Sequence, residues 1–260
     1  MSEQYLEIHV DNKVGHIILN RPEKRNAFNA ELISAMQHAF DAALENADIK
    51  VVVLKAHGDV FSAGADLAYL QELQNNSFEE NLADSERLAT LYKTIFTFPK
   101  PVIAQVQGHA IAGGCGLASV CDICYAVPEA KFGYTEVNIG FVPALVTVFL
   151  LRKLSDTHVR DLVLTGKLIP ADEAARIGLI TRVVDADKLQ AEVDVLCQQI
   201  VEGVSRKSMS VTKELLHTLR DAHLDEELKI AARFNATMRE TEDCKKGIAS
   251  FLEKKKISWD

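Results

Sequence analysis

Two loops rich in glycine and alanine carry the strongest chemical signal in the sequence. The loop at 61–67 reads FSAGADL and follows the apolar run 51–54, and the loop at 108–116 follows the apolar run 102–106. Small side chains let a ligand approach the backbone, and the start of a helix leaves N–H groups free to meet negative charge. Two such loops side by side could direct two N–H donors at one oxygen, the geometry that stabilises the enolate of a thioester.

Either loop alone is equally compatible with phosphate binding or with close packing of the backbone. The loop at 108–116 lacks the Gly-x-x-x-x-Gly-Lys-Ser/Thr pattern of a phosphate loop. No Gly-x-Gly-x-x-Gly dinucleotide fingerprint follows the first predicted strand. Nucleotide hydrolysis and hydride transfer therefore lose support.

One glutamate, Glu136, is the candidate for acid–base chemistry. Its apolar neighbours in the sequence are Phe132, Val137, Ile139 and Phe141. Removing a carboxylate from water disfavours its ionised form, so these neighbours would raise the pKa of Glu136 towards the range of a general acid–base. The alternative interpretation is a surface glutamate beside a turn.

Hydrophobic spacing predicts an α/β fold that would position these groups. The apolar runs 5–10 and 14–19 predict a hairpin, and helical spacing predicts a helix over 31–44 with Asn29 as its N-cap. Strands and helices then alternate, as in a fold with a largely buried sheet. We expect strands at 51–54, 101–106, 123–127 and 131–133, and helices at 85–96, 113–120, 145–154 and 156–164.

The last third of the chain is predicted to be mainly helical. The expected helices are 171–177, 189–201, 207–220, 225–240 and 242–255, with one strand at 180–184. Apolar faces within 225–255 need a partner to cover them. We therefore expect a core over 1–200 and a helical module over 201–260 that packs on the core or on another subunit. The polar stretch 73–81 is expected to be a surface loop or a frayed helix.

Composition and charge narrow the class of protein. The chain has 260 residues, of which 48% are hydrophobic, so it can bury a sizeable core. A net charge of −8 argues against a nucleic-acid partner, which requires a basic face. No apolar run reaches the roughly 18 residues that suggest a membrane span, and no secretory leader is visible.

Cysteine usage predicts a reducing, cytoplasmic location. The five cysteines form an odd number and have no disulfide-framework spacing. Cys121 and Cys124 have CxxC spacing but lack a second CxxC or a nearby histidine pair, so we expect buried thiols and no metal site.

Short motifs occur in a fixed order over nearly the whole chain. They are Asn20-Arg21-Pro22 with Asn26-Ala27, FSAGADL at 61–67, the loop at 108–116 with Cys121-Asp122, FGYTE at 132–136, Leu164-Thr165-Gly166 with AAxxGL at 174–179, and FLEK at 251–254. Each motif alone is weak, whereas their order and spacing together are highly specific. In this respect the chain resembles the crotonase superfamily of enoyl-CoA hydratases and isomerases.

The resemblance implies a fold, an assembly and a catalytic apparatus. The implied fold is a spiral of ββα units with a helical C-terminal trimerisation region, assembled as a homotrimer or a dimer of trimers. The N–H groups of Ala65 and Gly113 would form an oxyanion hole, and Glu136 would match the position of a catalytic glutamate. Coenzyme A would be part of an acyl-CoA thioester substrate, with no metal or redox cofactor.

The resemblance also implies residues that bind the coenzyme A portion of the substrate. Phe251 and Lys254 would come from a neighbouring subunit. For Lys24, Arg25 and Lys254, the alternative is a solvated charged surface. The implied set is Lys24, Arg25, Ala27, Ala63, Ala65, Asp66, Leu67, Gly114, Phe251 and Lys254.

The sequence departs from the family pattern around the catalytic residue. Hydratases usually carry a first glutamate where this chain has Gly116, and a proline usually stands where it has Thr135. A glycine-rich stretch is replaced by the bulkier residues 143–146. The polar groups that could compensate on the same loops are His109, Cys115, Tyr134 and Asn138, each of which could equally serve turns and packing.

Three main functions therefore remain open, beside decarboxylation or hydrolysis of an acyl-CoA thioester. The sequence around 132–137 looks most like hydratase-type members, including the methylglutaconyl-CoA hydratases, which favours hydration of a 2-enoyl-CoA. Loss of the first glutamate favours a Δ3–Δ2 enoyl-CoA isomerase, because one base is sufficient there. A CoA-binding scaffold without catalysis is the third. Arg87 and Lys93 are candidates to recognise a distal carboxylate on the acyl chain, with a surface position as the alternative.

Overall fold

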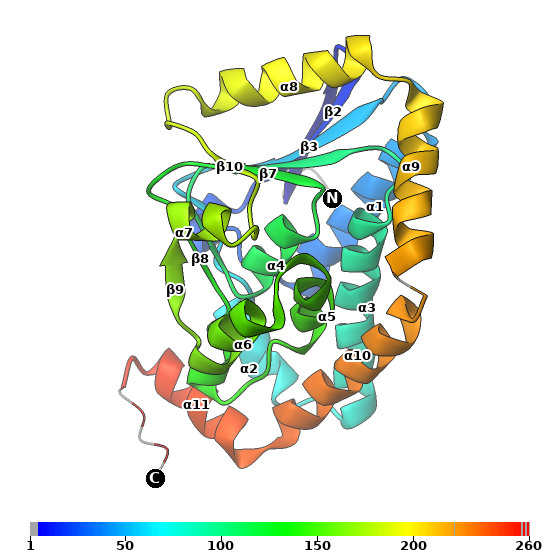
Figure 1. Ribbon diagram of the computed structural model, residues 1–260. Coiled ribbons are helices and arrows are strands. Elements are labelled where there is room, and N and C mark those ends of the chain that lie inside the picture. Colours follow the sequence, from blue (N-terminus) through cyan, green and yellow to red (C-terminus); the bar gives the residue numbers. More distant parts are fainter. Residues whose placement is uncertain (1–4, 221, 256, 258, 260) are drawn as a thin grey trace.

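The computed structural model describes residues 5–220, 222–255, 257 and 259 and shows an α/β fold built around two sheets (Figure 1). Within these residues one sheet has six strands in the order β1-β2-β3-β5-β7-β10, and the other has four in the order β4-β6-β8-β9. The first comprises β1 (Leu6–Asp11), β2 (Val14–Leu19), β3 (Val51–Ala56), β5 (Val102–Val106), β7 (Ile123–Ala126) and β10 (Arg182–Val183). The second comprises β4 (Val60–Ser62), β6 (His109–Ile111), β8 (Lys131–Gly133) and β9 (Leu168–Pro170). The predicted fold class is confirmed.

The helices cover both sheets and fill the C-terminal third. They are α1 (Ala30–Glu45), α2 (Leu67–Leu73), α3 (Phe78–Phe96), α4 (Gly113–Ser119), α5 (Ala144–Lys153), α6 (Asp156–Thr165), α7 (Ala171–Arg176), α8 (Leu189–Gly203), α9 (Arg206–Arg220), α10 (Leu224–Glu240) and α11 (Glu242–Leu252). Short 3-10 turns within the described residues include η2 (Pro22–Lys24) and η3 (Glu136–Ile139). The predicted cap of α1 is confirmed, since the Asn29 side chain accepts a hydrogen bond from the Leu32 N–H.

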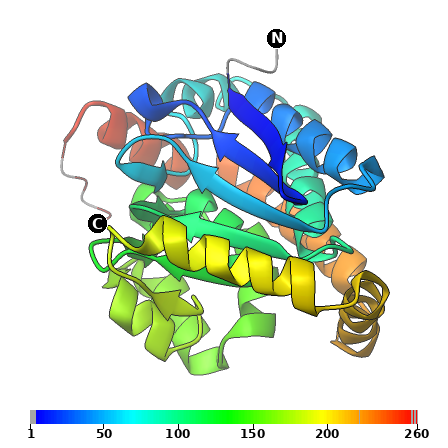
Figure 2. The same ribbon diagram turned by 90° about the horizontal axis from the view of Figure 1, so that it is seen from above.

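The six-stranded sheet is mostly parallel. β2, β3, β5, β7 and β10 run parallel, while the hairpin places β1 antiparallel at the edge. Val53 and Leu54 on β3 are fully buried, as expected for a parallel strand covered on both faces. Helix α8 contacts β3, β5 and β7, and Figure 2 shows it lying across these strands.

The four-stranded sheet positions the loops identified in the sequence. β4, β6 and β8 run parallel and adjacent, so their carboxyl ends lie at one edge of the sheet. The segment after β4 contains Ala65, the segment after β6 leads to Gly113, and the segment after β8 leads to Glu136. Three candidate catalytic positions far apart in the chain are therefore brought to one edge by strand order alone.

Sequence reasoning missed most of this second sheet. We expected loops at 61–67 and 108–116 directly after the strands at 51–54 and 101–106, but β4 and β6 occupy the first part of these loops. Each is three residues long, too short to show a hydrophobic period. The stretch 73–81 proves to be a turn at 74–77 between the end of α2 and the start of α3, where Ser77 and Glu80 form a capping box.

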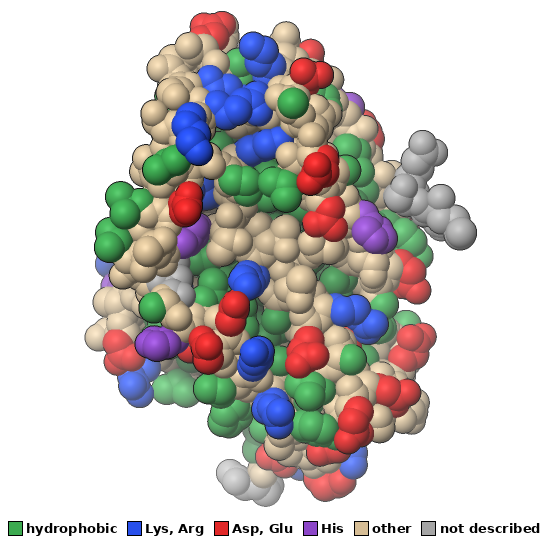
Figure 3. Space-filling model, turned by 90° about the vertical axis from the view of Figure 1, so that its right-hand side faces the viewer, with side chains coloured by type: hydrophobic (Ala, Val, Ile, Leu, Met, Phe, Trp, Pro, Cys, Tyr) green, Lys and Arg blue, Asp and Glu red, His purple; other side chains and the backbone are tan. Residues whose placement is uncertain are grey.

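The C-terminal helices pack on their own chain and still leave apolar side chains exposed. Helix α10 contacts α3 and α5, and α11 contacts η3 and α2. Figure 3 shows apolar side chains among charged ones on the face that α9 and α10 help to form. The exposed apolar residues on these two helices are Val211, Leu215, Leu216, Leu219, Ile230 and Phe234. The predicted trimer stays a prediction. None of the helices in the described ranges has the length and apolarity needed to cross a membrane.

Close packing of α4 against β4 gives a stability test. A Cβ at Gly114 would lie 2.4 Å from the Ser62 carbonyl oxygen, so Gly114→Ala must push the backbone apart. We expect this variant to lose about 1–3 kcal/mol in the free energy of unfolding, measured with urea. Gly203→Ala is the matched control, because nothing lies within 4 Å of a Cβ there, and it should be neutral or slightly stabilising. Equal stability of the two variants would contradict the packing described.

Candidate active site

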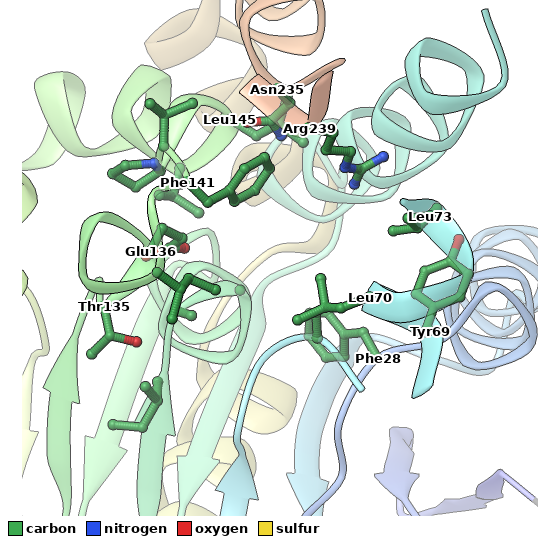
Figure 4. A pocket seen from close by; sticks show the side chains of 18 of the residues that line it. Phe28, Tyr69, Leu70, Leu73, Thr135, Glu136, Phe141, Leu145, Asn235 and Arg239 are labelled. Atoms are coloured by element: carbon green, nitrogen blue, oxygen red, sulfur yellow. The ribbon is translucent and has the colours of Figure 1, made fainter. Parts of the chain in front are cut away.

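The three loops surround one cavity of about 530 Å³. Its walls include Ala65 and Gly113 from the small-residue loops and Glu136 from η3. Apolar side chains form much of the remainder, and Figure 4 shows Phe28, Leu70 and Phe141 among them. The structure thus brings together the three residues that the sequence predicted to be catalytic.

The Ala65 loop is held on one side only. Phe28 N–H donates to Gly64 O at 2.7 Å, and Asp66 N–H donates to Phe28 O at 2.8 Å. Phe28 and Ala65 thereby form a short parallel bridge. Because successive N–H groups of an extended chain point in opposite directions, the Ala65 N–H faces away from Phe28. Among the described residues no backbone group accepts from the Ala65 N–H, which leaves it as a donor for a ligand.

The Gly113 loop provides the second donor. Gly113 is the first residue of α4, and the first N–H groups of a helix have no partner within it. A Cβ on Gly64 would lie 3.4 Å from Gly113 N and 2.9 Å from the Ala112 Cβ, so the two loops touch where Gly64 has no side chain. Gly64 also has φ +85°, a conformation that favours glycine. The two free N–H groups lie in adjacent loops, as an oxyanion hole requires.

Ala112 is strained at this junction. Its φ of 51° and ψ of −126° are rarely adopted by a residue with a side chain. Ala112 N–H donates to Gly133 O at 2.8 Å, and Ala112 O accepts from Gly116 N–H, so both neighbours hold the strained residue in place. Such conformations cluster at functional sites and cost on the order of 1–3 kcal/mol. No feature of the sequence marked Ala112.

Motif residues outside the cavity support the Ala65 loop. Arg21 is buried, and its guanidinium donates to Ala27 O at 2.6 Å and to the Asp66 carboxylate at 2.9 Å. Asn26 is fully buried, and its amide donates to His57 O and Val60 O. These contacts explain why the first motif pairs an arginine with an asparagine. Its residues position the loop rather than the substrate.

Glu136 has the environment expected of an acid–base group. Its Oε2 atom is buried and has no hydrogen-bond partner among the described residues. Burial raises the pKa of Glu136 to about 7, because the surrounding apolar side chains disfavour the ionised form. Figure 4 shows the carboxyl group directed into the cavity beneath Phe141. This environment agrees with the rise in the pKa of Glu136 that the sequence predicted.

The place of the missing first glutamate is filled. A Cβ at Gly116 would lie 2.4 Å from Val146 Cγ1 and 3.0 Å from the Tyr92 hydroxyl. Tyr92 is fully buried, and its hydroxyl donates to Gly113 O at 2.7 Å. Burial, and secondarily the charge of Glu136, raise the pKa of Tyr92, so it stays a neutral phenol. Sequence reasoning missed Tyr92, because on α3 it reads as a core residue.

The four other polar residues proposed to compensate for the missing first glutamate have different environments. His109 is exposed, and its ring accepts from the Lys131 N–H. Cys115 and Tyr134 are buried, which raises the pKa of both groups. Asn138 lines the cavity and donates to Gly166 O at 3.2 Å.

The predicted CoA-binding residues divide into three groups. Arg25, Ala63, Ala65 and Phe251 line the cavity, and Phe251 does so within its own chain, so it need not come from a neighbouring subunit. Ala27, Asp66 and Gly114 are buried outside the lining, with Asp66 capping α2 and paired to Arg21. Lys24, Leu67 and Lys254 are exposed beyond it.

A polar cluster at the far end of the cavity was not anticipated. Arg239 and Asn235 on α10 line the wall together with Asp84 on α3. The residues proposed from the sequence as cations of the pocket, Arg87 and Lys93, are instead half exposed and pair with Asp84 and Asp225. The i, i+4 spacing of Asn235 and Arg239 was a visible signal, but the lining of the cavity by α10 was not.

In the described ranges no cluster of His, Cys, Asp and Glu could hold a metal ion.

The sequence matches known proteins along nearly its whole length. The family model for enoyl-CoA hydratase/isomerase matches residues 9–260. The chain belongs to the enoyl-CoA hydratase/isomerase family. A Thermus thermophilus relative, provisionally named as an enoyl-CoA hydratase, is 41% identical over 242 residues, covering 93% of this chain and 95% of the relative.

A second named relative and a solved structure also match this chain along nearly their full length. A crotonyl-CoA hydratase of Syntrophomonas wolfei is 31% identical over 261 positions, covering 100% of this chain and 99% of the relative. The crystal structure of an enoyl-CoA hydratase from Mycobacterium avium superposes with a TM-score of 0.87 at 30% identity, covering 98% of this chain and 99% of that one. The crotonase-type fold is thereby confirmed for this family member.

The buried carboxyl group of Glu136 predicts how stability depends on pH. Its pKa is about 7 in the folded chain and 4.5 when solvated, so the folded state binds the proton more tightly. Wild-type stability, relative to Glu136→Gln, should therefore fall as pH rises from about 4.5 to about 7, by at most about 3 kcal/mol. Urea unfolding of both proteins across this range measures the difference. If the free energies of unfolding of the two proteins change in parallel with pH, the carboxyl group is solvated in the folded state.

Proposed function

We propose that this enoyl-CoA hydratase/isomerase family member adds water across the double bond of a 2-enoyl-CoA to give a 3-hydroxyacyl-CoA. The observation that carries the proposal is the Glu136 carboxyl group, whose buried Oε2 has no partner among the described residues, in the same cavity as the Ala65 and Gly113 N–H groups. The similarity to the Syntrophomonas wolfei crotonyl-CoA hydratase supports hydration as the reaction.

The proposed mechanism uses the two N–H donors and one carboxyl group. The thioester oxygen accepts from Ala65 N–H and Gly113 N–H. Ionised Glu136 takes a proton from water as the water oxygen bonds to C3, and the π electrons move to the thioester oxygen. The enolate then collapses as Glu136 returns the proton to C2. One carboxyl group serves both steps in turn, which places both additions on the same face of the double bond.

Tyr92 is proposed to position the attacking water. Its hydroxyl proton is engaged by Gly113 O, so the lone pairs of the hydroxyl oxygen remain free to accept from a water molecule. Glu136 can accept the second proton of the same water. The tyrosine thus takes part of the role that a first glutamate would have, without adding a charge to the cavity.

Isomerisation of a 3-enoyl-CoA is the second candidate. It is favoured by Gly116, because a single base can move a proton from C2 to C4 while the oxyanion hole holds the dienolate. This reaction needs no water, and Tyr92 would then serve packing alone.

We also propose assembly as a homotrimer or a dimer of trimers in the cytoplasm. The exposed apolar side chains of α9 and α10 support an interface. The five cysteines are free and buried, consistent with a reducing compartment.

Replacing the base tests the proposed reaction. Purified wild-type protein should remove the conjugated absorbance of crotonyl-CoA, with a rate that rises with pH through about 7 because the base must be ionised. Glu136→Gln should lower kcat by about 10²–10⁴-fold. Formation of conjugated product from a 3-enoyl-CoA, without loss of crotonyl-CoA, would establish isomerisation instead. Saturable binding without turnover of either substrate would indicate a scaffold.

Removing one oxygen tests the role of Tyr92. Tyr92→Phe keeps the ring in the core but loses the group that holds the water, so kcat for hydration should fall about tenfold. The KM for crotonyl-CoA and the affinity for butanoyl-CoA should change less than about twofold, because neither depends on the water. Loss of affinity alongside kcat would mean that Tyr92 acts only by supporting the Gly113 loop.

A further inference from the structure

The far end of the cavity holds buried polar atoms that no neighbour satisfies. Among the described residues, Asn235 Oδ1 and Arg239 Nε are buried without a hydrogen-bond partner. Both residues line the cavity, and Asn235 is only 6% exposed. A buried polar group without a partner is rare in a folded protein and points to a bound water, ion or ligand.

Arg239 is held in a fixed orientation. Its Nη2 donates to Asp84 at 2.9 Å, and its Nη1 donates to the backbone and side-chain oxygens of Asn81 at 3.2 and 3.3 Å. The guanidinium also lies over the Phe141 ring at 5.7 Å. Nε–H has no partner among the described residues, and Nη2 has one N–H besides the one that bonds Asp84, so Arg239 still has donors for a ligand. Figure 4 shows Arg239 reaching towards the cavity on the side of Phe141 opposite to Glu136.

A second buried donor lies next to Arg239. The Gln74 Nε2 group is buried without a partner among the described residues. Gln74 and Arg239 both border a void of about 10 Å³, large enough for one oxygen atom. This void shares Leu70, Leu73 and Phe141 with the main cavity, so it extends the far end. The free groups here are therefore rich in donors.

The charges at this end are not balanced within the cluster. Asp84 is 3% exposed and accepts from Tyr69, Arg87 and Arg239. Two guanidinium groups thus face one carboxylate. A single additional negative charge would be stabilised, whereas a purely apolar chain end would leave the donors unsatisfied.

From these observations we infer that the substrate is an enoyl-CoA whose acyl chain ends in a carboxylate, bound by Arg239 with Asn235 and Gln74. The inference rests on the proposed use of this cavity for an acyl-CoA, and it adds the class of acyl chain. The Asn235 amide can present its nitrogen to a carboxylate oxygen by a half-turn of the side chain. The thioester oxygen would then bind at the Ala65 and Gly113 N–H groups, and the distal carboxylate at Arg239.

Binding of saturated thioesters tests the inference without any chemistry. Succinyl-, glutaryl- and adipyl-CoA are compared by calorimetry with butanoyl-, pentanoyl- and hexanoyl-CoA, which match them in chain length and lack the carboxylate. At one length or more, the carboxylate should tighten binding by at least about tenfold. Because these compounds are not hydrated, the preference is measured whether or not the protein is a hydratase.

Variants of Arg239 and Arg87 show which residue produces the preference for a terminal carboxylate. Arg239→Met should reduce it to less than about twofold. Arg239→Lys, which keeps a charge beside Asp84 but removes Nε–H, should reduce it too and serves if the Met variant does not fold. Arg87→Met is the comparison variant: Arg87 also pairs with Asp84 but lies outside the lining, and its loss leaves Arg239 Nε–H in place, so this variant should weaken the preference much less than Arg239→Met does.

Three results would overturn the inference. The first is a preference below about twofold at every chain length, which would mean that water satisfies the buried groups. The second is an equal gain for the ω-hydroxy analogue of pentanoyl-CoA, which would show a neutral hydrogen-bonding site. The third is full loss of the preference in Arg87→Met, which would mean that the preference follows the total positive charge of the cluster and not Arg239 itself. Hydration of crotonyl-CoA together with any of these leaves the proposed reaction intact.

Discussion

The close approach of two backbone loops is the constraint on which the site depends. Gly64 meets the Ala112–Gly113 turn at a distance that leaves no room for a side chain. Three short parallel strands bring the loops to one edge, and the Arg21–Asp66 pair holds the first loop from behind. The backbone strain at Ala112 is retained because both sides of the turn are fixed. A donor pair built from backbone needs such support, since it has no side chain to adjust.

The cavity combines an apolar region with a charged region. Near Glu136 the walls are apolar, and the resulting desolvation brings the carboxyl group into the range where it can both accept and return a proton. At the far end, Asp84 and Arg239 bring charge into the same enclosure. Phe141 lies between the two regions and contacts the guanidinium with its face. The charge of Arg239 is paired with the Asp84 carboxylate, and burial remains the main influence on the pKa of Glu136.

Much of the site could be predicted because its signals are local. The two loops of small residues and a glutamate among apolar neighbours are visible in short stretches of sequence, whereas the choice of Ala65 and Gly113 as donors came from the resemblance to the crotonase superfamily. The long helices and the buried strand β3 were predictable from their periodicity. The short strands β4 and β6 were not, because three residues show no period. Arg239 joins the cavity only through the packing of α10 on α3, a contact between positions about 150 apart that spacing does not encode.

The filled space around Gly116 restricts how this chain could change its reaction. A second carboxylate at position 116 would need room that Val146 and Tyr92 now occupy. Any route to a two-glutamate site must therefore shorten Val146 first and accept a temporarily underpacked core before the acid is introduced. The order of such steps is set by volume rather than by chemistry. Positions 116 and 146 should thus vary together among relatives, small with large and large with small.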